Sequence, residues 1–159
     1  MDLYWEKLAG QLAAIIEEKK DKVAYVMGDK EVTYAQMDEM ACHIASGVAR
    51  MVEGKDADPA VPVRIGICLG RHEHVVPCIL AAVKLGCSYV PIDVETPRER
   101  RDFICKDAGL SVLITADNFN SLVESPLVDP LPVLSRGVSE AYMIYTSGTT
   151  GQPQRVSQP

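Results

Sequence analysis

The residue types best suited to chemistry lie between residues 142 and 154, where an apolar run passes directly into a loop of hydroxyls and glycines. The loop consists of Thr146, Ser147, Gly148, Thr149, Thr150 and Gly151. Glycine lets the backbone take positive φ and turn consecutive N–H groups inward, while Thr and Ser hydroxyls add donors at short range. We therefore predict a phosphate-binding site here. The alternative is a polar turn that only caps a strand.

The glycine spacing in this loop is not that of a Walker loop, which needs Gly, four residues and then Gly-Lys-Ser/Thr. Here Gly148 and Gly151 enclose two threonines, and no lysine follows directly. The pattern Tyr-Thr-Ser-Gly-Thr-Thr-Gly-x-Pro instead resembles the phosphate-binding signature of the adenylate-forming superfamily. That superfamily includes acyl-CoA synthetases, luciferases and the adenylation domains of nonribosomal peptide synthetases.

Two further segments resemble the same superfamily. Residues 32–37, Val-Thr-Tyr-x-x-Met, follow a predicted hairpin and are similar to the family's opening motif. Residues 86–93, Gly-Cys-Ser-Tyr-Val-Pro-Ile-Asp, are similar to its second signature. Physically, Gly86 suits the left-handed residue that ends a helix, and Tyr89 and Val90 can pack where the chain re-enters the sheet. These segments indicate the fold, and we assign them no chemistry.

The resemblance spans about residues 24–153 and reaches only the front part of the family's longer architecture. It implies ATP with Mg as cofactor, and a carboxylic or amino acid that is converted to an acyl-adenylate with release of pyrophosphate. The acyl group would then pass to a carrier-protein thiol or CoA. It also implies that residues 146–151 wrap the β and γ phosphates. The family's catalytic lysine and magnesium-binding acid lie downstream, so we assign no catalytic and no metal-binding residue.

Two residues depart from the family pattern, which continues Pro-Lys-Gly where this chain has Pro153, Gln154 and Arg155. A charge-assisted contact to phosphate is thereby lost. Arg155 could restore positive charge only from a position where the family has a glycine. We also expect the loop to be poorly ordered, with no strand or helix after it, which argues against ATP binding by this chain alone.

Composition places the chain in the globular class. At 159 residues it has the size of one domain, which we interpret as a single, partial adenylation subdomain covering 1–159. The net charge of −6 and the lack of a basic cluster argue against a nucleic-acid partner. Five cysteines without a Cys-x-x-Cys pair indicate buried thiols in place of disulfides or zinc ligands. Without a signal peptide or membrane-spanning run, we expect a cytoplasmic protein that binds no membrane.

Hydrophobic periodicity predicts an α/β fold with a largely parallel, layered sheet and flanking helices. The predicted helices cover residues 3–20, 33–54, 73–85, 96–109 and 117–124. The predicted strands cover residues 23–27, 31–33, 61–69, 88–93, 111–115 and 142–145. Ligands of such sheets collect beyond the carboxyl ends of the strands, which is where the glycine loop stands.

Local signals refine three of the predicted helices. Thr33 and Gln36 form a capping box, and so do Thr96 and Glu99 around a first-turn proline. The helix after Thr33 should bury a stripe that consists of Met37, Ala41, Ile44, Val48 and Met51 or Val52. The helix of residues 73–85 should turn Val76, Ile79, Leu80 and Val83 inward.

Three charged or polar groups favour a structural interpretation over a chemical one. His72 and His74 could ligate a metal, but at a strand-to-helix turn such residues more often face solvent. Arg98, Arg100 and Arg101 could bind an anion, although the first turns of a helix usually expose these charges. The acids Glu17, Glu18, Asp38 and Glu39 are best explained as a solvated face.

Three functions remain open at this point. The first is the N-terminal part of a truncated adenylate-forming ligase that is inactive on its own. The second is a stand-alone nucleotide-binding module. The third is a non-catalytic interaction subunit that pairs with a separate remainder of the enzyme, since half a sheet leaves apolar faces uncovered.

Overall fold

A computed structural model describes residues 4–54, 61–134, 140–147 and 153–158 of the chain. Its helices are α1 (Tyr4–Glu18), α2 (Tyr34–Val52), α3 (His72–Leu85), α4 (Arg98–Asp107) and α5 (Ala116–Val123). Its strands are β1 (Val23–Met27), β2 (Lys30–Thr33), β3 (Arg64–Cys68), β4 (Ser88–Pro91), β5 (Val112–Thr115), β6 (Tyr142–Ser147) and β7 (Pro153–Gln158). The predicted α/β class is confirmed.

The main sheet has five strands in the order β5-β3-β4-β6-β7, and β1 and β2 form a separate antiparallel hairpin. Strand β3 pairs in parallel with β4 on one side and β5 on the other, and β6 runs parallel to β4. Because β7 alone runs antiparallel among the described strands of this sheet, the sheet is largely parallel, as the sequence predicts.

Strand β7 corrects one prediction. We expected nothing to follow the glycine loop, yet residues 153–158 pair antiparallel with β6 along its whole length. The segment Pro-Gln-Arg-Val-Ser-Gln lacks the alternation of apolar and polar residues that is typical of a strand. Its backbone hydrogen bonds to β6 hold it at the sheet edge, which side-chain pattern alone does not reveal.

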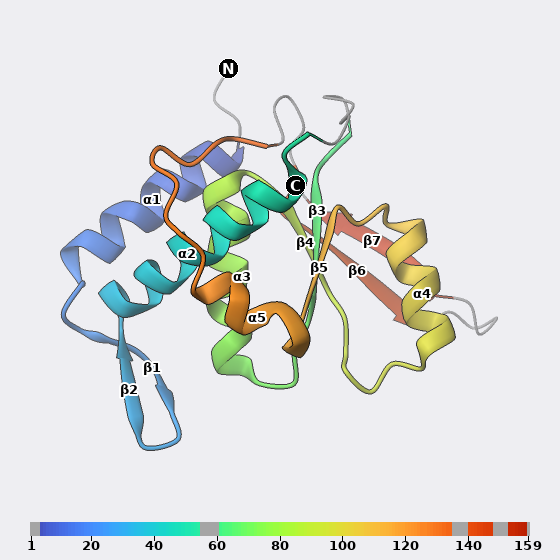
Figure 1. The fold of residues 1–159 in the computed structure, drawn as a ribbon, viewed down its shortest axis with the longest axis horizontal. Helices are drawn as coiled ribbons and strands as arrows, with labels where there is room; N and C mark the ends of the chain where they lie inside the picture. Colours follow the sequence, from blue (N-terminus) through green and yellow to red (C-terminus); the bar gives the residue numbers. More distant parts are fainter. Residues whose placement is uncertain (1–3, 55–60, 135–139, 148–152, 159) are drawn as a thin grey trace.

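Helices cover both faces of the sheet (Figure 1). On one face, the larger core joins α1, α2, α3 and α5 to Ile65 and Ile67 of β3. On the other face lies the smaller core, which combines Cys68, Val90, Ile92, Ile104, Ala108 and Met143 beneath α4. Gly66 permits this second contact, because a Cβ there would come within 2.5 Å of Leu110 Cδ1. Both faces of β3 are therefore buried, as is typical of parallel sheets.

The buried stripe of α2 is confirmed, with Val52 buried and Met51 exposed at its end. The stripe of α3 is partly wrong, since Val76 is exposed and Cys78, Ala81 and Leu85 are fully buried. These three residues lie at helical spacing. Cys78 and Ala81 have small side chains, which lets α3 pack closely against its neighbours. Gly86 ends α3 with φ 67° and ψ 29°, which confirms the predicted left-handed position.

The two predicted capping boxes have different outcomes. The Thr33 side chain accepts from the Gln36 amide at 3.2 Å, and the Gln36 side chain accepts from the Thr33 amide at 2.9 Å. The box at Thr96 is wrong, because Pro97 is the N-cap of α4 and no side chain caps it. The Thr96 amide instead donates to the Asp93 carbonyl at 3.0 Å. Thr96 therefore closes a turn one residue before the cap of the helix.

The cysteines are unpaired thiols, as predicted. Cys68, Cys78 and Cys87 are buried, while Cys42 and Cys105 are half-buried. Burial raises the pKa of the Cys78 and Cys87 thiols from 9.0 to about 12. Both thiols are thus held in the protonated, unreactive form near neutral pH.

Among the described residues, no helix combines the length and the apolar character needed to cross a membrane.

The Thr33 cap supplies the first prediction. Replacing Thr33→Ala removes a side-chain acceptor from the first turn of α2 and should lower the free energy of unfolding by about 1 kcal/mol. Thr96→Ala is the matched control, because its hydroxyl caps no helix, and it should change stability by less than about 0.5 kcal/mol. Urea denaturation measures both. Equal losses in the two variants would contradict this assignment of the caps.

The thiols supply a second prediction. At pH 8, iodoacetamide should modify Cys42 and Cys105 in the folded chain and leave Cys78 and Cys87 unmodified, because both burial and their raised pKa suppress the thiolate. Peptide mass spectrometry gives the order of labelling, with a urea-unfolded sample as the control in which all five react. Fast labelling of Cys78 in the folded chain would show that the α3 packing is wrong.

Candidate functional site

Strand β6, which leads into the glycine loop, ends at the carboxyl edge of the parallel strands. Because β3, β4 and β6 run the same way, their last residues, Cys68, Pro91 and Ser147, lie toward one edge. The backbones of Thr146 and Ser147 end β6, opposite Gln154 and Pro153 of β7. The remaining predicted site residues, Gly148, Thr149, Thr150 and Gly151, fall outside the described residues. The strands at each end of the loop are therefore placed where phosphate ligands collect in α/β sheets.

A hollow of about 520 Å³ opens beside the end of β6. It is lined by Pro91, Ile92, Asp93, Glu95, Thr96, Pro97, Arg100, Ile104, Ile144 and Tyr145. The lining combines the segment between β4 and α4 with the two β6 residues that precede Thr146. Its volume is that of a site for a small molecule, and it adjoins the amino end of the predicted phosphate loop.

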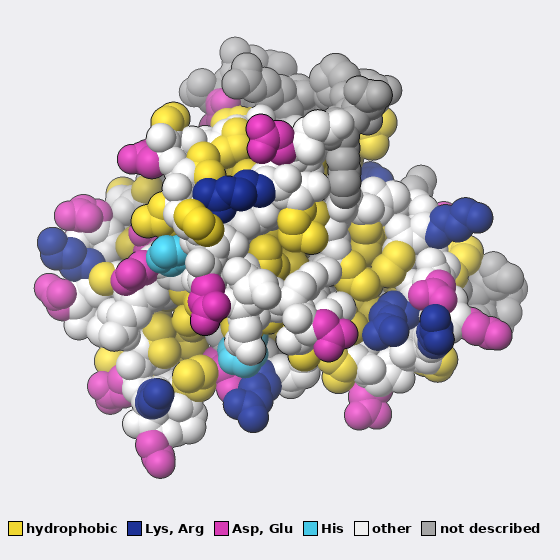
Figure 2. Space-filling view, in the orientation of Figure 1, with side chains coloured by type: hydrophobic (Ala, Val, Ile, Leu, Met, Phe, Trp, Pro, Cys, Tyr) yellow, Lys and Arg dark blue, Asp and Glu magenta, His cyan; other side chains and the backbone are white. Residues whose placement is uncertain are grey.

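The three arginines of α4 separate in the structure. Arg98 is exposed and lies 4.0 Å from Asp102 on the same helix, a solvated pair of little energetic consequence. Figure 2 shows Lys and Arg side chains interspersed with acidic ones over this region. Arg100 is half-buried and lines the hollow, so it differs from the expected fully solvent-facing residue. Arg101 is also half-buried.

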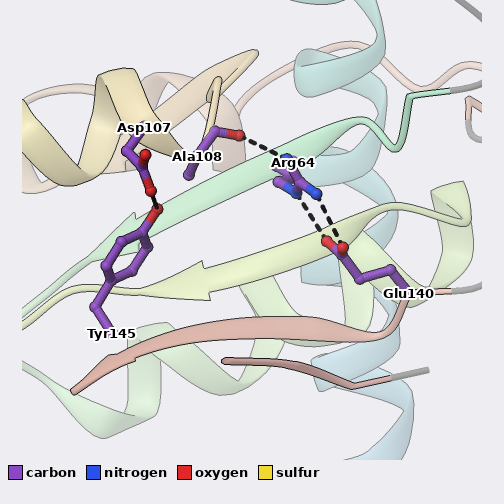
Figure 3. A network of polar contacts seen from close by, with 5 residues as sticks. All are labelled: Arg64, Asp107, Ala108, Glu140 and Tyr145. Atoms are coloured by element: carbon purple, nitrogen blue, oxygen red, sulfur yellow. Dashed lines mark hydrogen bonds and ion pairs between the residues drawn. The ribbon is translucent and has the colours of Figure 1, made fainter. Parts of the chain in front are cut away.

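A polar network that the sequence did not reveal lies across the sheet from α2 and α3 (Figure 3). Arg64 Nε donates to Glu140 Oε1 at 2.8 Å and Arg64 Nη2 donates to Glu140 Oε2 at 3.0 Å. A third donor of the same guanidinium, Nη1, reaches the Ala108 carbonyl at 3.0 Å. The hydrogen bond to Glu140 is the main cause of the raised Arg64 pKa. This two-bond geometry is the strongest form of Arg–carboxylate pairing.

Two tyrosines complete the surroundings of β6. Tyr145 Oη donates to Asp107 Oδ2 at 2.7 Å, which ties the strand to the end of α4. Tyr89 of β4 and Tyr142 of β6 place their ring centroids 5.8 Å apart. Burial, and secondarily Tyr142, raises the pKa of Tyr89, so this phenol stays protonated at neutral pH. These tyrosines act in packing and hydrogen bonding, and we assign them no proton transfer.

The remaining candidates are structural. His74 is half-buried and stacks on Phe119 with ring centroids 4.3 Å apart, whereas we expected a solvent-facing residue. Asp38 lies 2.6 Å from Lys84 Nζ and joins α2 to α3, so it is no member of a solvated acidic face. Glu17, Glu18 and Glu39 are exposed, as expected.

The fit of the implied Mg²⁺ can be tested on the acidic side chains. In the part of the chain that the structure describes, no three His, Cys, Asp or Glu side chains converge as a metal site. The described residues therefore offer no preformed ligand set for the metal, and we derive no step through it. The hydroxyl and glycine loop suits phosphate by its own donors.

Sequence comparison identifies relatives of the chain. The AMP-binding enzyme family matches residues 12–157. A plipastatin synthase polypeptide of Bacillus subtilis (strain 168) is 37% identical over 147 residues, which cover 84% of this chain and 4% of that protein. The probable non-canonical nonribosomal peptide synthetase CymA of Salinispora arenicola (strain CNS-205) is 33% identical over 163 residues, covering 96% of this chain and 2% of that protein. The chain thus spans a small fraction of these synthetases.

Structural comparison agrees on the fold. The N-terminal subdomain of Klebsiella oxytoca NpsA, in complex with 3-hydroxyanthranilyl-AMSN, superposes with a TM-score of 0.74 at 22% identity, covering 99% of this chain and 40% of that one. The O-succinylbenzoate coenzyme A synthetase of Bacillus subtilis, in complex with AMP, gives a TM-score of 0.76 at 20% identity, covering 98% and 42%. Because the family match spans nearly the whole sequence, this chain belongs to the AMP-binding enzyme family, and its fold is that of the N-terminal part of the solved structures that it matches.

Proposed function

We propose that this chain is the phosphate-binding front part of an adenylation domain, and that residues 146–151 bind the β and γ phosphates of ATP. The observation that carries the proposal is the place of Thr146 and Ser147 at the carboxyl edge of β6, beside a hollow of about 520 Å³. The hydroxyls and glycine-rich backbone of this segment are the donors that a phosphate chain requires.

In the complete enzyme, the supported reaction is acyl-adenylate formation. A carboxylate oxygen of the acid attacks the α phosphorus of ATP, the bond from that phosphorus to the oxygen that bridges it to the β phosphorus breaks, and pyrophosphate leaves. Negative charge accumulates on the leaving pyrophosphate. N–H and hydroxyl donors of residues 146–151 stabilise that charge, which is the contribution of this part of the chain.

An amino acid is the substrate class that the relatives favour. One relative is named as a nonribosomal peptide synthetase, a class of enzyme that joins amino acids, and it is 33% identical to this chain. The resulting acyl group would be handed to a carrier-protein thiol, with CoA as the alternative acceptor. The solved neighbours at 20% and 22% identity support the fold and do not discriminate between acids.

Strand β7 favours a second candidate, a module that binds nucleotide without completing the reaction. The loop of residues 148–152 is joined at both ends to paired strands, with Thr146 opposite Gln154 and Ser147 opposite Pro153. Fixing both ends of a loop lowers the entropy that ligand binding must remove. We therefore expect the isolated chain to bind ATP weakly and to form no acyl-adenylate.

A lysine at position 154 tests the phosphate assignment. Gln154→Lys places the family's cation opposite Thr146, and the added charge-assisted contact should tighten ATP binding about tenfold. Gln158→Lys adds the same charge at the far end of β7, opposite Tyr142, and should leave the affinity within about twofold. Isothermal titration calorimetry with ATP compares the variants. An equal gain in both would indicate general charge attraction and contradict the loop assignment.

Exchange of radioactive pyrophosphate into ATP tests the inactivity of the isolated chain. We expect no exchange with any proteinogenic amino acid, because the chain spans only about 40% of the solved chains whose fold it shares. A full-length adenylation domain serves as the positive control. Exchange above background by the purified chain would contradict the proposal that this part lacks the catalytic step.

A further inference from the structure

Strand β6 is joined to the rest of the sheet by few backbone contacts. Four residue pairs connect β3 with β4, and four connect β3 with β5. Among the described residues, a single pair, Tyr89 with Tyr142, registers β6 on β4, and beside it the Tyr89 amide donates to the Ala141 carbonyl at 3.2 Å, whereas six pairs join β6 to β7. The β6–β7 hairpin is therefore a cohesive unit whose position on the sheet is weakly specified by the ladder itself.

Side chains add to the backbone pairing at the amino end of β6. Glu140 precedes the strand by two residues, and its carboxylate is held by two donors of Arg64, the first residue of β3. Since β4 lies between β3 and β6, this ion pair spans the weak junction. The side chains of Arg64 and Glu140 retain 14% and 10% exposure, so the pair is shielded from water and stiff.

A second contact holds the carboxyl end of the same strand. Tyr145 Oη donates to Asp107 at 2.7 Å, and Tyr145 directly precedes Thr146. Asp107 is the last residue of α4, and the next residue, Ala108, accepts the third hydrogen bond of Arg64. Both contacts thus converge on the end of α4 (Figure 3). Met143, which lies between them in the sequence, is buried and adds an apolar contact to the smaller core.

We propose that Arg64, Glu140, Tyr145 and Asp107 are positioning residues that set where the paired strands β6 and β7, and hence the backbones of Thr146 and Ser147 at the end of β6, stand on the sheet. This inference rests on the proposed function only for its consequence in ATP binding. The four side chains act by reinforcing the short backbone pairing between β4 and β6, with the end of α4 as their common anchor.

Hydrogen–deuterium exchange of the full chain tests the positioning directly. Glu140→Gln keeps the side-chain shape and removes the ion pair, so amides of residues 142–147 should exchange at least about tenfold faster. Amides of β3 and β5 should change less than about twofold. Tyr145→Phe is a milder variant that removes one hydroxyl, and it should accelerate exchange mainly at the end of β6. Arg64→Lys should give an intermediate rate between wild type and Arg64→Met.

Asp38→Asn provides the matched control, because it breaks the ion pair with Lys84 that joins α2 to α3 and leaves β6 untouched. It should not accelerate exchange in residues 142–147. If Glu140→Gln accelerates β3, β5 and β6 equally, or leaves β6 unchanged, the positioning role is overturned.

ATP titration of the same variants separates the two proposals. If the four side chains position β6 and β7, the Kd for ATP should rise more in Glu140→Gln than in Asp38→Asn. If the wild-type chain shows no ATP binding, the proposed function fails, while the exchange rates still decide the role of the four side chains.

Discussion

The ion pair between Arg64 and Glu140 is the contact on which the arrangement of the candidate site depends. It joins the start of the buried strand β3 to the segment that leads into β6, and it crosses over β4 to do so. A half-buried, bidentate pair of this kind is costly to break, because either partner left alone would remain charged in a poorly solvated place. The network therefore favours one placement of β6 over shifted alternatives.

Both faces of β3 are buried, so the strand that carries Arg64 is held firmly in place. Ile65 and Ile67 face the larger core, while Gly66 and Cys68 face the smaller one. The helices that close these cores leave the carboxyl edge of the sheet open, and the hollow beside β6 forms there. Thus the same packing that stabilises the sheet leaves space at the edge where the hydroxyl and glycine segment begins.

The sequence predicted the features that depend on local chemistry. The capping box of Thr33, the left-handed Gly86 and the apolar stripe of α2 each follow from residues close to one another in the chain. Prediction failed where distant segments decide the outcome. Strand β7 forms because β6 is available to pair with it, and His74 is drawn from solvent by Phe119. Arg64 and Glu140 are 76 positions apart, so no local pattern offers a reason to join them.

The central claim is that residues 146–151 contact the phosphates of ATP. Backbone amide resonances of isotopically labelled chain, followed by NMR during an ATP titration into the millimolar range, test it most directly. The account predicts saturable shifts at Thr146–Gly151 and at the start of β7, with the β1–β2 hairpin unchanged. Constant resonances at Thr146–Gly151, or shifts confined to another face of the molecule, would contradict it.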